Sequence, residues 1–118
     1  MPFYNLREID FRQKQKGIYG KIVDGEKMQM ALVHLDFGIE TNHSHPNEQI
    51  GYVLSGSAEI QIGKEKRICG AGEAYLIPSD VKHGFKVLSQ DGMDYMEIFC
   101  PPKEENRNVN NPAQRTGL

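Results

Sequence analysis

Alternation between polar and apolar residues is the feature of this sequence that most limits its fold. Short alternating segments are separated by turn residues, and no sustained apolar period of 3.6 residues is present. A period of about two residues is typical of half-buried strands, whereas a period of about 3.6 would indicate amphipathic helices. The pattern therefore predicts an all-β fold, with strands at residues 18–23, 28–37, 49–54, 58–62, 85–88 and 93–100.

Four reversals join these strands. Asp24-Gly25, Ser55-Gly56 and Asp91-Gly92 each separate two of the segments, and a fourth reversal is expected within residues 63–66. Dipeptides of this kind favour tight turns because glycine adopts positive φ without a steric penalty. Many short strands joined in this way leave exposed edges unless they close into a barrel or a two-sheet jelly roll. We expect such a jelly roll.

The length and composition fit one domain followed by a polar tail. At 118 residues the chain is close to the common size of a single domain. We place the barrel domain at residues 1–100, because Pro101-Pro102 stops the last strand and the sequence from Lys103 to Leu118 is polar and Asn-rich. Residues 101–118 are expected to be poorly ordered or packed loosely on a partner surface.

Charge and hydrophobicity exclude several classes of function. Hydrophobic residues make up 38% of the chain, charged residues make up 25%, and the formal net charge is -2, so the basic stripe that DNA or RNA would demand is missing. No segment approaches the roughly 18 apolar residues that span a bilayer, so we expect no membrane partner and a cytoplasmic protein. Cys69 and Cys100 form no C-x-x-C pair, and both are expected to be free thiols that act as small buried apolar side chains.

Three histidines and a glutamine have the spacing of a metal site. His43 and His45 point to the same side of an extended segment, Gln49 begins the following strand, and His83 follows a turn segment. Imidazole nitrogens and an amide oxygen suit one divalent transition metal such as iron, nickel, manganese or zinc. Because all four ligands are neutral, we expect a Lewis-acidic centre that attracts a small anionic molecule. His34 lacks this spacing and is expected to be a surface or hydrogen-bonded histidine.

Residues on the neighbouring strands indicate a substrate pocket. Gly51 shares a face with Gln49, where its missing side chain would leave room for a bound molecule, although a β-bulge glycine is an equal alternative. Phe85 shares a face with His83. On the last strand, alternation separates Met93, Tyr95, Glu97 and Phe99 from Asp94, Met96, Ile98 and Cys100, and either set could face the interior.

We expect Phe85, Tyr95 and Phe99, together with Gly51, to line the pocket. If its face lines the cavity, Glu97 could move protons in an aromatic setting, whereas the alternative is a solvated strand carboxylate. Lys103 could reach back to an anionic ligand, and its alternative is a solvated tail lysine.

The histidine and glycine spacings resemble the cupin family. The first motif of that family is a glycine, then H-x-H, then a carboxylate or amide, then a second glycine, and the second motif is G-x5-P-x-G-x2-H-x3-N. The residues that match are Gly38, His43, His45, Gln49 and Gly56 in the first motif, and Gly72, Pro78 and His83 in the second. The chain departs by having one residue fewer between Gly38 and His43, and by having Asp80 and Val87 in place of the second glycine and the asparagine. The resemblance implies a single-domain cupin jelly roll that binds its metal through His43, His45, Gln49 and His83.

A finer resemblance concerns the end of the last strand. Small cupins with a three-histidine, one-glutamine site that act on uronic-acid breakdown products carry the pattern acid, x, Phe, x, Pro, x, basic residue. Here the pattern is Glu97-Ile98-Phe99-Cys100-Pro101-Pro102-Lys103, with glutamate and lysine where aspartate and arginine are more usual. The resemblance implies catalytic roles for Glu97 and Lys103 in opening the ring of 4,5-unsaturated uronates from pectin or alginate. Lysine cannot make the bidentate carboxylate contact that arginine makes.

Three functions therefore remain open. In the leading hypothesis, the metal binds the substrate carboxylate and a ring or anomeric oxygen while Glu97 moves a proton, as an isomerase would require. The alternatives are an iron-dependent dioxygenase with the same ligands and a non-enzymatic protein that binds or senses a small acid. We also expect a homodimer, because the stretch from Met28 to Phe37 has apolar residues on both faces and a partner chain would cover the outer one.

Overall fold

Antiparallel strands make up nearly all of the regular structure, as the alternating pattern predicted. The structure is a computed structural model, and it describes residues 2–107. The strands are β1 (Arg12–Gln15), β2 (Ile18–Asp24), β3 (Gln29–Leu35), β4 (Glu48–Ser55), β5 (Ser57–Ile62), β6 (Glu65–Gly70), β7 (Ala74–Ile77), β8 (His83–Val87) and β9 (Met93–Cys100), followed by the 3-10 turn η1 (Glu104–Asn106). Within the described range, no helix is long and apolar enough to cross a lipid bilayer.

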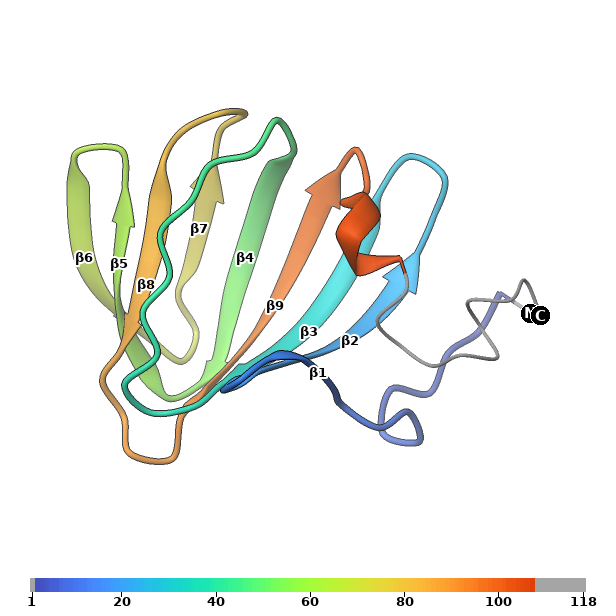
Figure 1. The fold of residues 1–118 in the computed structure, drawn as a ribbon, viewed down its shortest axis with the longest axis horizontal. Coiled ribbons are helices and arrows are strands. Elements are labelled where there is room, and N and C mark those ends of the chain that lie inside the picture. Colours follow the sequence, from blue (N-terminus) through green and yellow to red (C-terminus); the bar gives the residue numbers. More distant parts are fainter. Residues whose placement is uncertain (1, 108–118) are drawn as a thin grey trace.

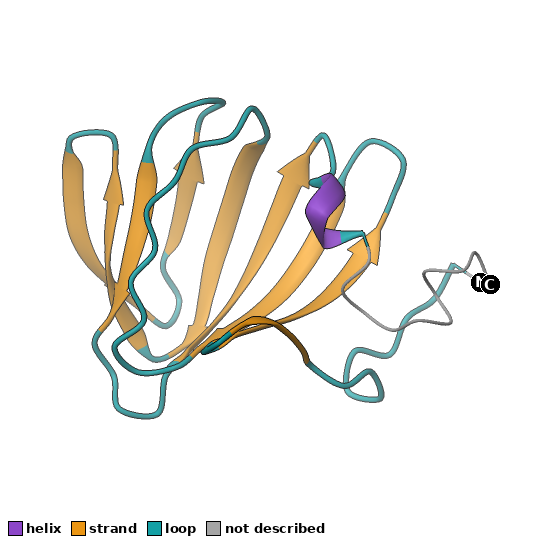
Figure 2. Cartoon of the chain, viewed as in Figure 1, coloured by secondary structure: helices purple, strands orange, loops and turns teal. Residues whose placement is uncertain are grey.

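Two sheets face each other (Figures 1 and 2). One has six strands in the order β1-β2-β3-β9-β4-β7, and the other has three strands in the order β6-β5-β8. The last strand, β9, lies between β3 and β4 and pairs antiparallel with both. The all-β jelly roll expected from the sequence is therefore confirmed.

The predicted reversals are present, but the predicted segments did not include β1, β6 or β7. Gly56, Gly63 and Gly92 have φ of 79°, 60° and 83°, which is the left-handed conformation that glycine adopts at least cost. Strand β1 has the sequence Arg-Gln-Lys-Gln, which is polar throughout, and its residues are all exposed. An edge strand of this composition has no alternation that a sequence pattern could detect.

The core follows the two-residue period of β3 and β9. On β9, Met93, Tyr95, Glu97 and Phe99 are buried, so the structure resolves which face of this strand points inward. Cys100 belongs to the opposite face and is exposed, so the expectation that it would be buried is wrong. Cys69 is buried, and both cysteines are free thiols.

The segment after β9 packs against the barrel. Lys103 and Asn106 are only 8% and 1% exposed, so the expectation of a loosely packed tail is wrong for them. The side chain of the buried residue Gln29 holds this segment, because it donates to the Lys103 carbonyl at 3.1 Å and accepts from the Asn106 amide at 3.1 Å. In Figure 1 the turn η1 accordingly lies across β3 and β9. The rest of the predicted tail, residues 108–118, lies outside the described residues.

Candidate functional site

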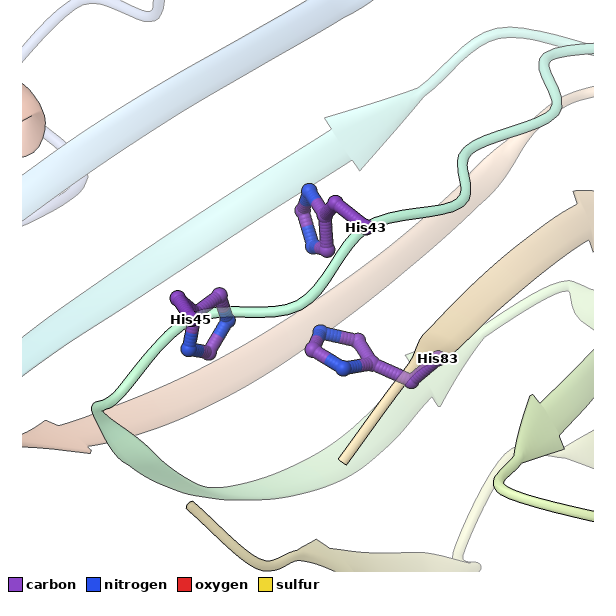
Figure 3. Close-up of side chains that lie close together, drawn as sticks. All are labelled: His43, His45 and His83. Atoms are coloured by element: carbon purple, nitrogen blue, oxygen red, sulfur yellow. The ribbon is translucent and has the colours of Figure 1, made fainter. Parts of the chain in front are cut away.

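Three histidine side chains converge at one end of the barrel, where His43 is exposed, His45 is half-buried and His83 is buried. His43 and His45 lie in the connection between β3 and β4, and His83 begins β8 (Figure 3). One ring nitrogen of each lies within 4.8 Å of the others. The ring centroids of His43 and His83 are 4.6 Å apart, and those of His45 and His83 are 4.8 Å apart. The tertiary structure thus brings together the histidines that the sequence singled out.

Backbone pairing fixes these histidines in place. His43 and His83 form an isolated antiparallel bridge, in which each backbone N–H donates to the other carbonyl at 2.8 Å. Nδ1 of His45 lies 3.0 Å from the Asn47 carbonyl, and Nδ1 of His83 lies 2.9 Å from the Val81 carbonyl. Because a carbonyl oxygen only accepts, Nδ1 carries the hydrogen in both rings and Nε2 presents its lone pair.

The atoms that would bind a metal are buried and have no hydrogen-bond partner within residues 2–107. These atoms are Nε2 of His45, Nε2 of His83 and Oε1 of Gln49. Buried acceptors without a donor are rare and costly in folded proteins, so three of them around one point call for a ligand. Two imidazoles, a third from His43, and an amide oxygen suit a divalent transition metal. The residues present therefore fit such an ion.

The surroundings keep the histidines neutral, as metal ligation requires. Burial, and then the charge of His83, lower the pKa of His43 to about 4. Burial also lowers the pKa of His45 and His83. A neutral imidazole can bind a cation without first losing a proton, which favours metal binding at neutral pH.

Glu97 lies beside the candidate metal ligands. It is 5% exposed, and its Oε2 accepts hydrogen bonds from the Tyr75 hydroxyl at 2.8 Å and from the Gln49 amide nitrogen. Burial raises the pKa of Glu97 to about 7, against the opposing effect of these two hydrogen bonds and of Lys103. The carboxyl group can therefore exist in both protonation states near neutral pH.

A cavity of about 810 Å³ opens in front of these residues. Its walls include Phe85, Tyr95 and Phe99, as well as Glu97 and Lys103. Lys103 is held over the Phe99 ring, with its ammonium 5.3 Å from the ring centroid. These predicted pocket residues are thus found around one cavity, and their roles toward a substrate remain a proposal.

Gly51 does not line this cavity, and the expectation that it leaves room for a substrate is wrong. A Cβ atom built on Gly51 would overlap the ring of Tyr75, which occupies the space instead. Tyr75 comes from the neighbouring strand β7, where it pairs directly with Gly51. The absence of a side chain at Gly51 therefore makes room for the Tyr75 ring, whose hydroxyl group bonds Glu97.

Sequence reasoning missed the residues that support the site. Tyr75 and Gln29 are both buried, and each acts through a hydrogen bond to a residue far away in the chain. The glycine at position 51 indicated that some group fills the space beside it, but not that this group is Tyr75. No short motif indicated Gln29. His34 behaves as expected, because Nδ1 lies 2.9 Å from an oxygen of Asp94, away from the cluster.

The similarity to known proteins agrees with this geometry. The profile of the cupin domain family matches residues 32–99. The pectin degradation protein KdgF of Dickeya dadantii (strain 3937) is 34% identical over 101 residues, which cover 83% of this chain and 91% of that protein. The solved structure of KdgF from a Halomonas species is 30% identical, with a TM-score of 0.80 over 87% of this chain and 96% of the other. An RmlC-like cupin from Shewanella frigidimarina NCIMB 400 has a TM-score of 0.81 at 20% identity, over 87% of this chain and 93% of the other, which is a likeness of fold alone.

Proposed function

Because the chain belongs to the cupin domain family, we propose that it is a metal-dependent enzyme that opens the ring of 4,5-unsaturated uronates. Its similarity, over most of both chains, to a pectin degradation protein supports a small sugar acid as the substrate. The observation that carries the proposal is the buried Glu97 carboxyl group, which lies in the cavity and is bound to Gln49 of the candidate metal cluster.

The candidate metal ligands lie at one end of the cavity, where a bound metal could interact with a substrate oxygen. His43, His45, Gln49 and His83 would hold one divalent transition metal, which would supply Lewis acidity when bound. The aromatic walls lower the local dielectric constant, and this strengthens electrostatic interactions beside them. Lys103 contributes a positive charge that suits an anionic substrate.

Glu97 is suited to the proton transfers of ring opening. In that reaction a proton leaves the anomeric hydroxyl, the bond from the anomeric carbon to the ring oxygen breaks, and a proton reaches the vinylic carbon. No oxidant or reductant is consumed. Tyr75 and Gln49 both bind Oε2, which leaves Oε1 of Glu97 to take the first proton and to return one. A pKa of about 7 suits both steps near neutral pH.

The test is the turnover of a 4,5-unsaturated uronate by the Glu97→Gln variant, followed by ultraviolet absorbance. Loss of a positioned acid or base should lower the rate by about 10²- to 10⁴-fold, with metal content and fold retained. Glu48→Gln is the matched control, because Glu48 is exposed at the start of β4, and it should keep the wild-type rate. An unchanged rate in Glu97→Gln would remove Glu97 from the mechanism.

Oxygen and chelator controls separate the competing functions. Turnover should be the same with and without dioxygen, and it should stop when a chelator removes the metal. Strict oxygen dependence would favour the dioxygenase alternative. Binding of small acids without turnover of any unsaturated uronate would favour a binding or sensing protein.

A further inference from the structure

A bulge in the edge strand β1 brings a lysine to the cavity. Arg12 pairs with Gly20 and Gln13 with Tyr19, but the next pair is Gln15 with Ile18, so Lys14 is an additional residue without a partner on β2. Bulges bend a strand and redirect the side chain at the bulge. Lys14 lines the cavity, and the proposed chemistry gives it no role.

Lys14 and Lys103 place two positive charges around the same space. Crowding by protein, and then the charge of Lys103, lower the pKa of Lys14, whereas the carboxylates of Glu105 and Glu97 raise it. In residues 2–107, no carboxylate lies within ion-pair distance of the Lys14 ammonium. Lys103 lies 3.5 Å from Glu105, but that glutamate is 71% exposed, and such pairs are weak. Two cations beside one cavity repel each other, and an anion bound between them would offset this repulsion.

Asn106 also lines the cavity and adds a hydrogen-bond acceptor. It is 1% exposed and lines the cavity, and its Nδ2 donates to Gln29 at 3.1 Å. Its Oδ1 is buried and accepts no hydrogen bond from the residues that the structure describes. A buried acceptor without a donor is costly, so a hydroxyl of a ligand would relieve that cost.

We propose that Lys14 and Lys103 hold the carboxylate of the sugar acid between them, and that Asn106 Oδ1 accepts a hydrogen bond from a neighbouring hydroxyl. This subsite rests on the proposed function in its choice of a sugar acid, and it deepens that function by assigning the carboxylate to lysines instead of to the metal. The roles of Lys14 and Asn106 are in binding and orientation, since neither lies at the histidine cluster.

The test measures equilibrium binding of galacturonate and of its uncharged methyl ester by NMR titration of the metal-loaded protein. Lys14→Met should weaken galacturonate binding about 5- to 30-fold, as expected for one partly solvated charge-assisted contact, and should leave ester binding unchanged. Lys16→Met is the matched control, because Lys16 is an exposed lysine of the same hairpin that does not line the cavity, and it should change neither affinity. Asn106→Ala should weaken the acid and the ester equally, by about threefold to tenfold, because both ligands keep the hydroxyl.

Several outcomes would overturn the subsite. These are absence of galacturonate binding to the wild-type protein, equal binding of the acid by wild type and Lys14→Met, and equal losses for acid and ester in Lys14→Met. Turnover separates this inference from the reaction. Lysine-dependent binding of galacturonate without turnover of an unsaturated uronate would refute the proposed reaction and keep the subsite. Turnover of an unsaturated uronate with the same KM in wild type and Lys14→Met would support the proposed reaction and refute the subsite.

Discussion

Gln49 donates a hydrogen bond from its side-chain nitrogen to Oε2 of Glu97 on the adjacent strand β9. This bond fixes the amide so that the opposite atom, Oε1, is buried beside the histidines and has no hydrogen-bond partner in the described part of the chain. The residue that orients a candidate metal ligand is therefore also the candidate proton carrier. Ligands are commonly held by such outer partners, so metal binding and proton transfer are expected to be coupled here.

The first prediction concerns the metal. Protein purified without chelator should contain close to one divalent transition metal per chain by elemental analysis. His83→Ala should bind the metal at least about 100-fold more weakly, because the loss of an outer partner alone costs about 10- to 100-fold. His34→Ala is the control and should bind normally, since His34 lies outside the cluster. A metal-free protein that takes up no added nickel, zinc or iron would refute the site.

Gly51→Ala should destabilise the protein. The new Cβ would displace the Tyr75 ring, which is 8% exposed and hydrogen-bonded to Glu97, so overpacking should cost about 1–3 kcal/mol in the free energy of unfolding. Urea unfolding measures the change. Gly70→Ala is the matched control, because a Cβ at Gly70 has its nearest neighbour at 3.8 Å. Equal stabilities of the two variants would show that Tyr75 does not need this space.

The stability of the metal-free protein should depend on pH through Glu97. Its pKa is raised from 4.5 to about 7 on folding, so the folded protein holds this proton more tightly than the unfolded chain does. The stabilising contribution is present below pH 4.5 and is lost as the pH rises through about 7. A glutamine oxygen still accepts both hydrogen bonds but does not titrate.

Glu97→Gln should therefore gain stability relative to wild type between about pH 5 and pH 8, by up to about 3 kcal/mol. Urea unfolding in the presence of chelator measures this difference at each pH. A difference that stays constant with pH would mean that Glu97 does not titrate in this range.

We expect a homodimer that covers the outer face of the six-stranded sheet. Ile50, Tyr52 and Leu76 on that face are 50%, 42% and 52% exposed, and Ile50 is paired with both Leu76 and Ile98. A continuous apolar face of this kind is typical of an interface. Light scattering should give the dimer mass at micromolar concentration, and Ile50→Lys should shift it toward the monomer. A monomer mass for the wild-type protein would contradict the prediction.

Local patterns in the sequence determined six of the nine strands of the described residues, the turns and the candidate metal ligands. The two-residue period predicted β3 and β9, and the dipeptide Ser55-Gly56 predicted a turn where Gly56 has positive φ. The motif spacing identified His43 and His83, because strand alternation and turn lengths are properties of short segments.

Contacts between distant segments decided everything else about the site. The inward face of β9 depends on its two neighbours β3 and β4, so alternation alone left the position of Glu97 open. Tyr75 fills the space at Gly51, and Gln29 holds Lys103 across 74 positions of the chain. Such contacts form only in the folded chain, because the two partners are far apart in the sequence. A local two-residue period carries no information about which distant residue each side chain will contact.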